Sequence, residues 1–348
     1  MTFDFQDSSL LQKAVQQCEF LTEDQAKDFI TNGFVVIKSA FSQEIAERIC
    51  TTAWDELQEV HDISAKDRSS WRGKPDGYIR TSGQKLQIRL IEEAPQARQA
   101  QLDILGGSDR LPNEGRDLSL HGGIIANFGV DGDSPWQPPG PHQNGWHKDG
   151  WHFRHFLDSP EQGLLTVPIY TEILPESGGT FLAKDSIAPV ARLLSKQPEG
   201  FHADGTQGNG YLIPYLVEQC SEFVELTGEP GDLAIVHPYM LHRRTVNPSD
   251  RPRFIANLAI VLTEPMNFNR DAEDAYSLTE LAVLHALGEE SINFNTTSPR
   301  AAYMPTPFRD KEDFDVQRGV LLKEMAEMAN RGVVTPAWAE SFGYMSNR

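Results

Sequence analysis

The stretch from Leu118 to about Leu262 constrains the fold most, because it consists of short apolar runs separated by turn residues. Its runs include "GGIIANFG", "GLLTVPIYTEI", "FVELTGEPGDLAIVHP" and "RFIANLAIVL". Several short strands punctuated by Gly, Pro and Asp are typical of an all-β sandwich or barrel. We therefore expect an all-β core in this part of the chain, with α-helices on its flanks.

The segment before this region has clear helix signals. Thr22 and Gln25 have the spacing of a capping box, which predicts a helix that Gly33 ends. "FVVIKSAF" then predicts a strand, and Ser42 is placed to cap a second helix to about Val60. The polar residues 61–117 predict loops with some helix.

The chain turns helical again after the β region, in "LTELAVLHALG" and "VQRGVLLKEMAEMANRG". There is no internal repeat and no low-complexity tract. We expect a single domain over residues 1–348, with a core over residues 20–262 and a helical C-terminal extension over residues 270–348. The sequence does not indicate the oligomeric state.

The net charge of -19 argues against nucleic acid or an anionic membrane as the main partner. No window is long and apolar enough for a transmembrane helix, and the first residues do not resemble a signal peptide. The three cysteines are scattered, which argues against a disulfide framework and a cysteine zinc site. We therefore expect a cytoplasmic protein that acts on a small molecule.

One short segment, "GWHKDGWHFRHF" at residues 145–156, holds three of the ten histidines. In an extended strand, His147 and Asp149 project from the same face and can reach one point. A second histidine region follows, with His237 and His242 five residues apart, so one regular strand cannot direct both inward. Two histidines and one carboxylate match the facial triad that leaves iron positions open, and Arg253 follows eleven residues after His242.

These motifs resemble the phytanoyl-CoA dioxygenase family of Fe(II)- and 2-oxoglutarate-dependent oxygenases. The resemblance covers roughly residues 20–262 and includes "WHKD", "LPESGGT" and "GDLAIVHPYMLHRRTVNPSDRPR". It implies a double-stranded β-helix, a cupin-like jelly roll of two facing antiparallel sheets. It also implies that His147, Asp149 and His242 bind the iron, whereas His237 occupies a position that is not a ligand.

The resemblance further implies 2-oxoglutarate and O2 as co-substrates, with Arg253 anchoring the far carboxylate of 2-oxoglutarate. Arginine suits this task because its planar fork binds a carboxylate with two hydrogen bonds and stays charged. Asn127 and Thr180 are candidates to donate hydrogen bonds to the same molecule, although simple strand and turn roles remain open for both.

The sequence indicates the residues that contact the primary substrate less clearly. Trp146, Trp151, Phe153, Arg154 and Arg244 are candidate substrate contacts, but the aromatic residues also suit packing. The basic stretch from residue 66 to residue 89 is either a solvated face or an anion-receiving wall. The chain departs from the family pattern at "FLAKDS" and in the arginines after His242, so the family's substrate does not carry over.

We expect a hydroxylase that oxidises an unactivated C–H bond and releases succinate and CO2. Because Asp149 is a carboxylate, where halogenases of the family have a small residue, halogenation is not expected. The net charge would repel a multiply phosphorylated acyl-CoA, so a small carboxylate-bearing metabolite is the preferred substrate. The alternatives are an acyl-CoA 2-hydroxylase, a catalytically inert metabolite-binding jelly roll, and a zinc hydrolase.

Overall fold

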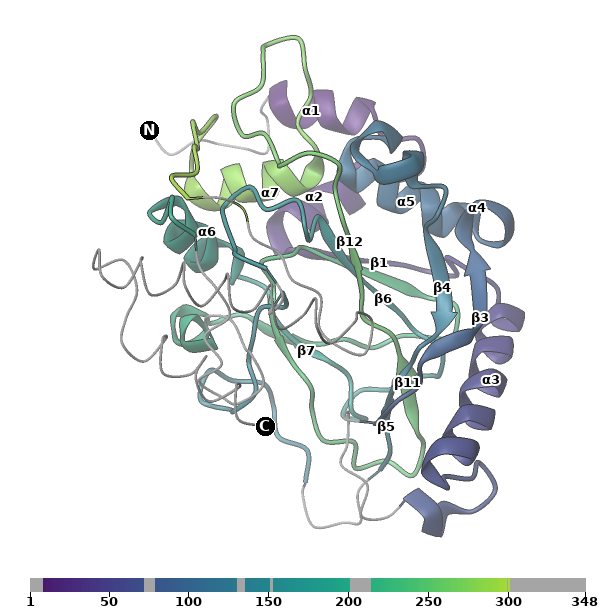
Figure 1. Cartoon of the computed structure of the whole chain (residues 1–348). Coiled ribbons are helices and arrows are strands. Elements are labelled where there is room, and N and C mark those ends of the chain that lie inside the picture. The colour runs from purple at the N-terminus through teal and green to yellow at the C-terminus, as the bar shows by residue number, and fades with distance from the viewer. Residues whose placement is uncertain are drawn as a thin grey trace.

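The protein is described here by a computed structural model that covers residues 9–71, 79–129, 135–150, 153–200, 214–298 and 300. Short strands occupy its centre, with α3 along one side and other helices gathered above them (Figure 1). The described strands are all paired antiparallel.

One sheet has four strands in the order β1 (Phe34–Ile37), β9 (Leu233–Val236), β6 (Leu164–Pro168) and β12 (Leu258–Ile260). A second group has the order β11 (Arg253–Ile255), β5 (Ile125–Asn127) and β2 (Ile79–Arg80). A bridge between Ile169 and Ile255 continues the pairing of β6 with β12 in the same register. The two groups therefore form one larger sheet.

The facing sheet has the order β10 (Leu241–Arg243), β7 (Phe181–Ala183) and β8 (Phe223–Glu225), and the bridge between His147 and His242 extends it beyond β10. Along the chain, β5, β6, β9 and β11 belong to the larger sheet, while the His147 segment, β7, β8 and β10 belong to the smaller one. This alternation confirms the predicted jelly roll.

The space between the sheets is apolar. Its buried side chains come from both sheets, with Val167 and Val236 on the larger sheet and Leu182 on β7. The opposite face of the larger sheet is buried too, because Leu164 and Ile235 belong to a second cluster that includes residues of the flanking helices. β6 and β9 are therefore buried on both faces, which explains their largely apolar sequences.

The predicted N-terminal elements are confirmed. α2 (Glu23–Asn32) begins at a capping box formed by Thr22 and Gln25, and Gly33 ends it with φ 72°. A Cβ at Gly33 would lie 2.6 Å from Cε of Met240, so this left-handed, crowded position requires glycine. α3 (Gln43–His61) begins at the side-chain cap Ser42.

Residues 61–117 contain more structure than the predicted loops with some helix. β3 (Gly83–Arg89) pairs with β4 (Ser119–Gly122), but Ile88 is the only buried residue of β3. Such an exposed strand has a weak apolar alternation, which is why the sequence did not indicate it. The other helices are α1 (Ser9–Gln16), α4 (Leu90–Glu93), α5 (Pro95–Leu105) and α6 (Ile187–Ser195), with short 3-10 turns at Arg68–Trp71, Ser108–Arg110, Pro112–Gly115 and Pro214–Gln219.

α7 (Leu278–Leu287) lies in the region predicted to be a helical extension and packs against α2, α5 and α6. The expected helix in "VQRGVLLKEMAEMANRG" falls outside the described residues. Within the described residues, no helix is long and apolar enough to cross a membrane.

Glu280 of α7 is fully buried and connects several segments. It forms ion pairs with Arg270 at 2.8 Å and Arg110 at 3.3 Å, and it accepts a hydrogen bond from the Asn267 N–H. Burial by itself would raise the pKa of Glu280, but the two arginines outweigh it and lower the pKa. The ionised carboxylate therefore holds the loop before α7 in place.

We expect Glu280→Gln to lower the free energy of unfolding by about 3 kcal/mol at neutral pH, because it leaves two arginines beside a neutral amide. The folded-state pKa is lowered, so the stabilisation is complete above the usual glutamate pKa and is lost as pH falls through the folded-state value. Urea unfolding of both proteins at several pH values measures this. If Glu280→Gln lowered the free energy of unfolding by the same amount at all pH values, this expectation would be contradicted.

Candidate metal centre

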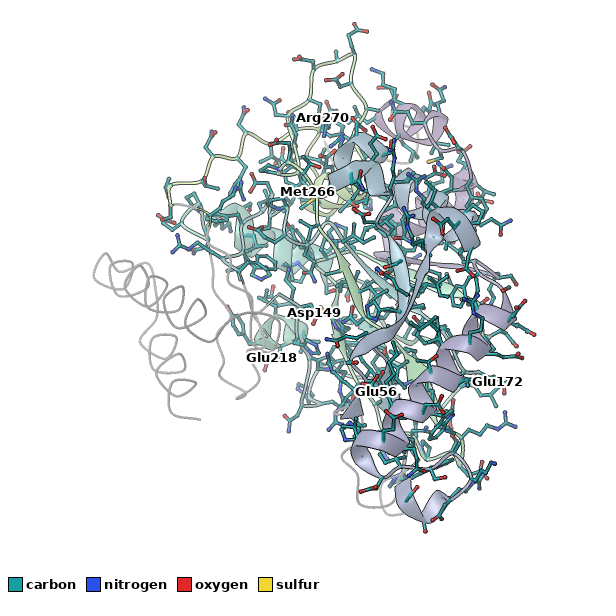
Figure 2. The ribbon with its side chains drawn as sticks, turned by 45° about the vertical axis from the view of Figure 1, so that its right-hand side comes forward. Glu56, Asp149, Glu172, Glu218, Met266 and Arg270 are labelled. Carbon is teal, nitrogen blue, oxygen red and sulfur yellow. The ribbon has the colours of Figure 1, made fainter. Side chains whose placement is uncertain are left out.

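The structure brings His147, Asp149 and His242 together. One ligand atom from each residue lies within 4.8 Å of the other two, and among the described residues this is the one His, Cys, Asp or Glu group with such geometry. His147 Nε2 lies 3.4 Å from Asp149 Oδ1, and His242 Nε2 lies 3.5 Å from Asp149 Oδ2. Figure 2 shows Asp149 in the middle of the molecule, between Met266 and Glu56.

Backbone pairing sets the distance between the two histidines. The N–H of His147 donates to the carbonyl of His242, and the N–H of His242 donates back, both at 3.0 Å. Residues that face each other across an antiparallel pair place their side chains on the same face. The ring centroids consequently lie only 4.4 Å apart.

Each histidine ring is oriented by a backbone carbonyl. His147 Nδ1 lies 2.8 Å from the oxygen of Gly145, and His242 Nδ1 lies 3.1 Å from the oxygen of Met240. A carbonyl only accepts, so each Nδ1 carries a proton, and Nε2 is the nitrogen left to offer its lone pair once a metal takes the place of any proton on it. Both Nε2 atoms face Asp149, which is the orientation that a metal requires.

The carboxylate of Asp149 is held as an anion. Burial would raise its pKa, but the neighbouring His242 and the hydrogen bonds from both histidines lower the pKa well below its usual value. Asn257 Nδ2 also donates to Asp149 Oδ2 at 2.5 Å.

The donor set fits a divalent transition metal. With metal–ligand distances of about 2.0–2.2 Å, neighbouring ligand atoms lie about 3–3.5 Å apart, close to the two nitrogen–oxygen distances of the site. Two imidazoles and one carboxylate are the donors of the non-haem iron facial triad, which keeps further coordination positions open. His147, Asp149 and His242 would therefore hold Fe(II).

Lys148, between two of these residues, is a feature that sequence reasoning missed. It is 2% exposed, and its Nζ donates to His155 Nδ1 at 2.9 Å, Gln162 Oε1 at 3.1 Å and the Asp149 carbonyl at 3.2 Å. His155 Nε2 in turn bonds the Gly150 carbonyl at 2.6 Å. Burial lowers the pKa of Lys148 to about 7. The network fixes the backbone that follows Asp149.

His237 lies apart from the triad. It is fully buried at the end of β9, where its Nε2 bonds the Thr279 carbonyl at 3.2 Å and its Nδ1 accepts from the Tyr239 N–H. Burial lowers its pKa to about 3, so the ring is neutral at physiological pH. His237 therefore connects the sheet to α7, and His242 is the histidine that joins Asp149.

Arg253 and Asn127 lie together in the interior. They are register partners on β11 and β5, and both are at most 2% exposed. Arg253 Nε donates to the Gly178 carbonyl at 3.0 Å, and Asn127 Nδ2 donates to the same carbonyl at 3.5 Å and to the Thr245 carbonyl at 3.0 Å. Thr180, two residues after Gly178, is half-buried.

Arg251, two residues before Arg253, lies in a different environment. Arg251 is exposed, lies before β11 and forms an ion pair with Glu172 at the surface.

Three of the candidate substrate contacts are buried in the structure. Trp146 is 1% exposed, lies against Phe223 and donates to the Gly140 carbonyl. Phe153 is fully buried against His155, and Arg154 is 1% exposed. Trp146 and Lys148 alternate with His147 and Asp149, so they belong to the other face.

Arg244 is exposed, whereas Trp151 lies outside the described residues. The basic stretch over residues 66–89 corresponds to a solvated face where it is described. Arg68 is paired with Asp250, Lys85 with Glu59, and Arg89 with Glu92, all at the surface.

The chain was compared with known proteins. No family profile and no curated protein match it. It is similar to the solved structure of the non-heme alpha ketoglutarate dependent carbocyclase SnoK from nogalamycin biosynthesis, with 15% identity, 72% of this chain and 87% of that chain covered, and a TM-score of 0.43. It is also similar to the epimerase SnoN of the same biosynthesis, with 13% identity, 68% and 80% covered, and a TM-score of 0.39.

A third similar structure is EctD from S. alaskensis with 2-oxoglutarate and 5-hydroxyectoine, with 15% identity, 69% of this chain and 76% of that chain covered, and a TM-score of 0.36. Identities and TM-scores this low support no assignment of the site, which therefore depends on the residues of this chain alone.

We expect His242→Ala to weaken Fe(II) binding by at least about two orders of magnitude, roughly 3 kcal/mol, because a ligand is lost. His237→Ala is the matched control: it should lower stability but leave the affinity of the folded protein unchanged. Anaerobic metal titration and thermal unfolding of both variants measure this. Retained affinity in His242→Ala with lost affinity in His237→Ala would show that the distal ligand is misassigned.

Proposed function

We propose that the protein is an Fe(II)- and 2-oxoglutarate-dependent oxygenase of the phytanoyl-CoA dioxygenase type. The observation that carries this proposal is the convergence of His147, Asp149 and His242, with Arg253 buried on β11, directly before the segment that supplies a hydrogen-bond donor to Asp149. A structural zinc site has four protein ligands, whereas three leave positions for co-substrates.

The protein's own residues have distinct tasks in this proposal. Two neutral imidazoles and one carboxylate hold the metal, which together with 2-oxoglutarate and O2 supplies oxidation of a C–H bond with release of succinate and CO2. One carboxylate and a doubly charged diacid exceed the charge of Fe(II) by about one unit. A buried guanidinium offsets this excess, and Arg253 is 2% exposed.

The position of Arg253 suits the far carboxylate of 2-oxoglutarate. Arg253 and Asn257 are four residues apart on one extended segment, so their Cα atoms are about 13 Å apart. An arginine side chain and a five-carbon diacid can bridge this span together. Asn127 beside Arg253 has a buried Oδ1 for which the described residues provide no hydrogen-bond partner, and its amide group is a further contact for the co-substrate.

For the primary substrate, we propose a small carboxylate-bearing metabolite that is hydroxylated. Half-buried Arg243, whose guanidinium lies 5.7 Å from the Phe181 ring centroid, and exposed Arg244 directly follow the distal histidine. They supply positive charge beside the site, while the net charge of -19 disfavours a multiply phosphorylated acyl-CoA. The alternative is acyl-CoA 2-hydroxylation.

Turnover assays distinguish these possibilities. The protein with Fe(II), 2-oxoglutarate and O2 should release succinate, and the release should increase in the presence of small carboxylates whose mass rises by one oxygen atom. An inert binding protein would consume no O2, and a zinc hydrolase would act without O2. Turnover of long-chain acyl-CoA with none of small carboxylates would overturn the substrate proposal but not the reaction class.

We expect Arg253→Lys to raise the Kd for 2-oxoglutarate by one to two orders of magnitude, roughly 1.4–2.8 kcal/mol, because lysine keeps the charge but lacks the planar fork. Fe(II) affinity should be nearly unchanged. Arg251→Lys serves as the control, since Arg251 is exposed and paired with Glu172. An unaltered Kd for 2-oxoglutarate in Arg253→Lys would remove Arg253 from the anchoring role.

A further inference from the structure

The carboxylate of Asp149 has a neighbour with no role assigned by the sequence motifs. Asn257 Nδ2 donates to Asp149 Oδ2 at 2.5 Å. We propose that Asn257 is a positioning residue that orients the Asp149 carboxylate for metal binding. This inference rests on the proposed function, because it assigns Asp149 as a metal ligand.

The strand geometry explains how Asn257 reaches the site. The bridge of Ile255 with Ile169 and the pairing of Leu258 with Thr166 keep one register, so the two residues between β11 and β12 continue the extended course of these strands. Alternate residues of a strand share a face. Ile255 lies in the apolar space between the sheets, and Asn257 therefore projects into the same space, where Asp149 is.

The direction of the Asn257 amide is fixed by chemistry. An ionised carboxylate only accepts hydrogen bonds, so the NH2 group must face Asp149. The two oxygens of Asp149 differ in their partners: Oδ2 accepts from Asn257 and lies 3.5 Å from His242 Nε2, whereas Oδ1 lies 3.4 Å from His147 Nε2.

The other end of this amide indicates why Asn257 is present. Its Oδ1 is buried, and the described residues provide it with no hydrogen-bond partner. An unsatisfied buried carbonyl costs about 1–3 kcal/mol. A side chain selected for stability alone would avoid this cost, whereas a residue that orients a metal ligand would bear it. Holding Oδ2 also favours coordination through one oxygen, which keeps the remaining positions of a facial triad open.

Co(II) titration tests this role without any turnover. We expect Asn257→Leu to weaken Co(II) binding 10–100-fold, the usual effect of losing a partner that orients a ligand. The visible absorption of bound Co(II) should change as well, because Asp149 is then free to rotate. The melting temperature should stay equal or rise, since the unsatisfied carbonyl is gone. Asn257→Ala, which also lacks the donor, provides a second variant if the leucine does not fit.

Asn269→Leu is the matched control: it loses one exposed hydrogen bond, to Asn293, and should bind Co(II) like the wild type. Co(II) affinity and spectrum unchanged in both Asn257 variants would overturn the inference, as would a large loss of stability with unchanged affinity. A wild-type protein that binds no Co(II) would overturn the metal site as a whole. Failure of succinate release with normal Co(II) binding would instead count only against the proposed reaction.

Discussion

The pair of reciprocal backbone hydrogen bonds between His147 and His242 is the constraint on which the site depends. Both bonds measure 3.0 Å, and they connect the segment after β5 to β10. With this pairing fixed, alternation along the first segment places Asp149 on the same face as the histidines. A slip of one residue in this register would turn His242 away from the site. The surrounding jelly roll therefore keeps the two segments in this register.

Much of this could be predicted from sequence because the signals are local. The caps at Thr22 and Ser42 involve residues three positions apart, and the buried strands β6 and β9 are largely apolar runs. The same-face geometry of His147 and Asp149 follows from strand alternation alone. The choice of His242 over His237 came from resemblance, and the structure supports it by burying His237 against α7.

The remaining site features depend on contacts between distant parts of the chain. Asn257 reaches Asp149 across 108 positions, and no pattern around Asn257 marks it as a neighbour of a metal ligand. The sequence left two roles open for Trp146, a substrate contact and packing. Alternation with His147 places Trp146 on the opposite, packed face. Applying the alternation to every residue of "WHKD" would also have placed Lys148 inside the core.

The interior of the protein contains several charges, and each has partners. Lys148 bonds His155 and Gln162, while Glu280 bonds Arg270 and Arg110. Buried ion pairs contribute little net stability compared with apolar packing, but they fix geometry. Lys148 restrains the backbone after Asp149, and Asn257 restrains its side chain. The carboxylate that a metal would meet is therefore oriented before any ligand arrives.

The most direct test of the account is visible spectroscopy of the Fe(II) protein under anaerobic conditions. A 2-oxo acid that chelates Fe(II) through its oxo and carboxylate groups produces a metal-to-ligand charge-transfer band. The account predicts that this band appears as 2-oxoglutarate is added and saturates at one equivalent bound per chain. Fe(II) bound to the protein with no such band at saturating 2-oxoglutarate would contradict it, because the metal would then lack the two adjacent open positions on which the proposed chemistry depends.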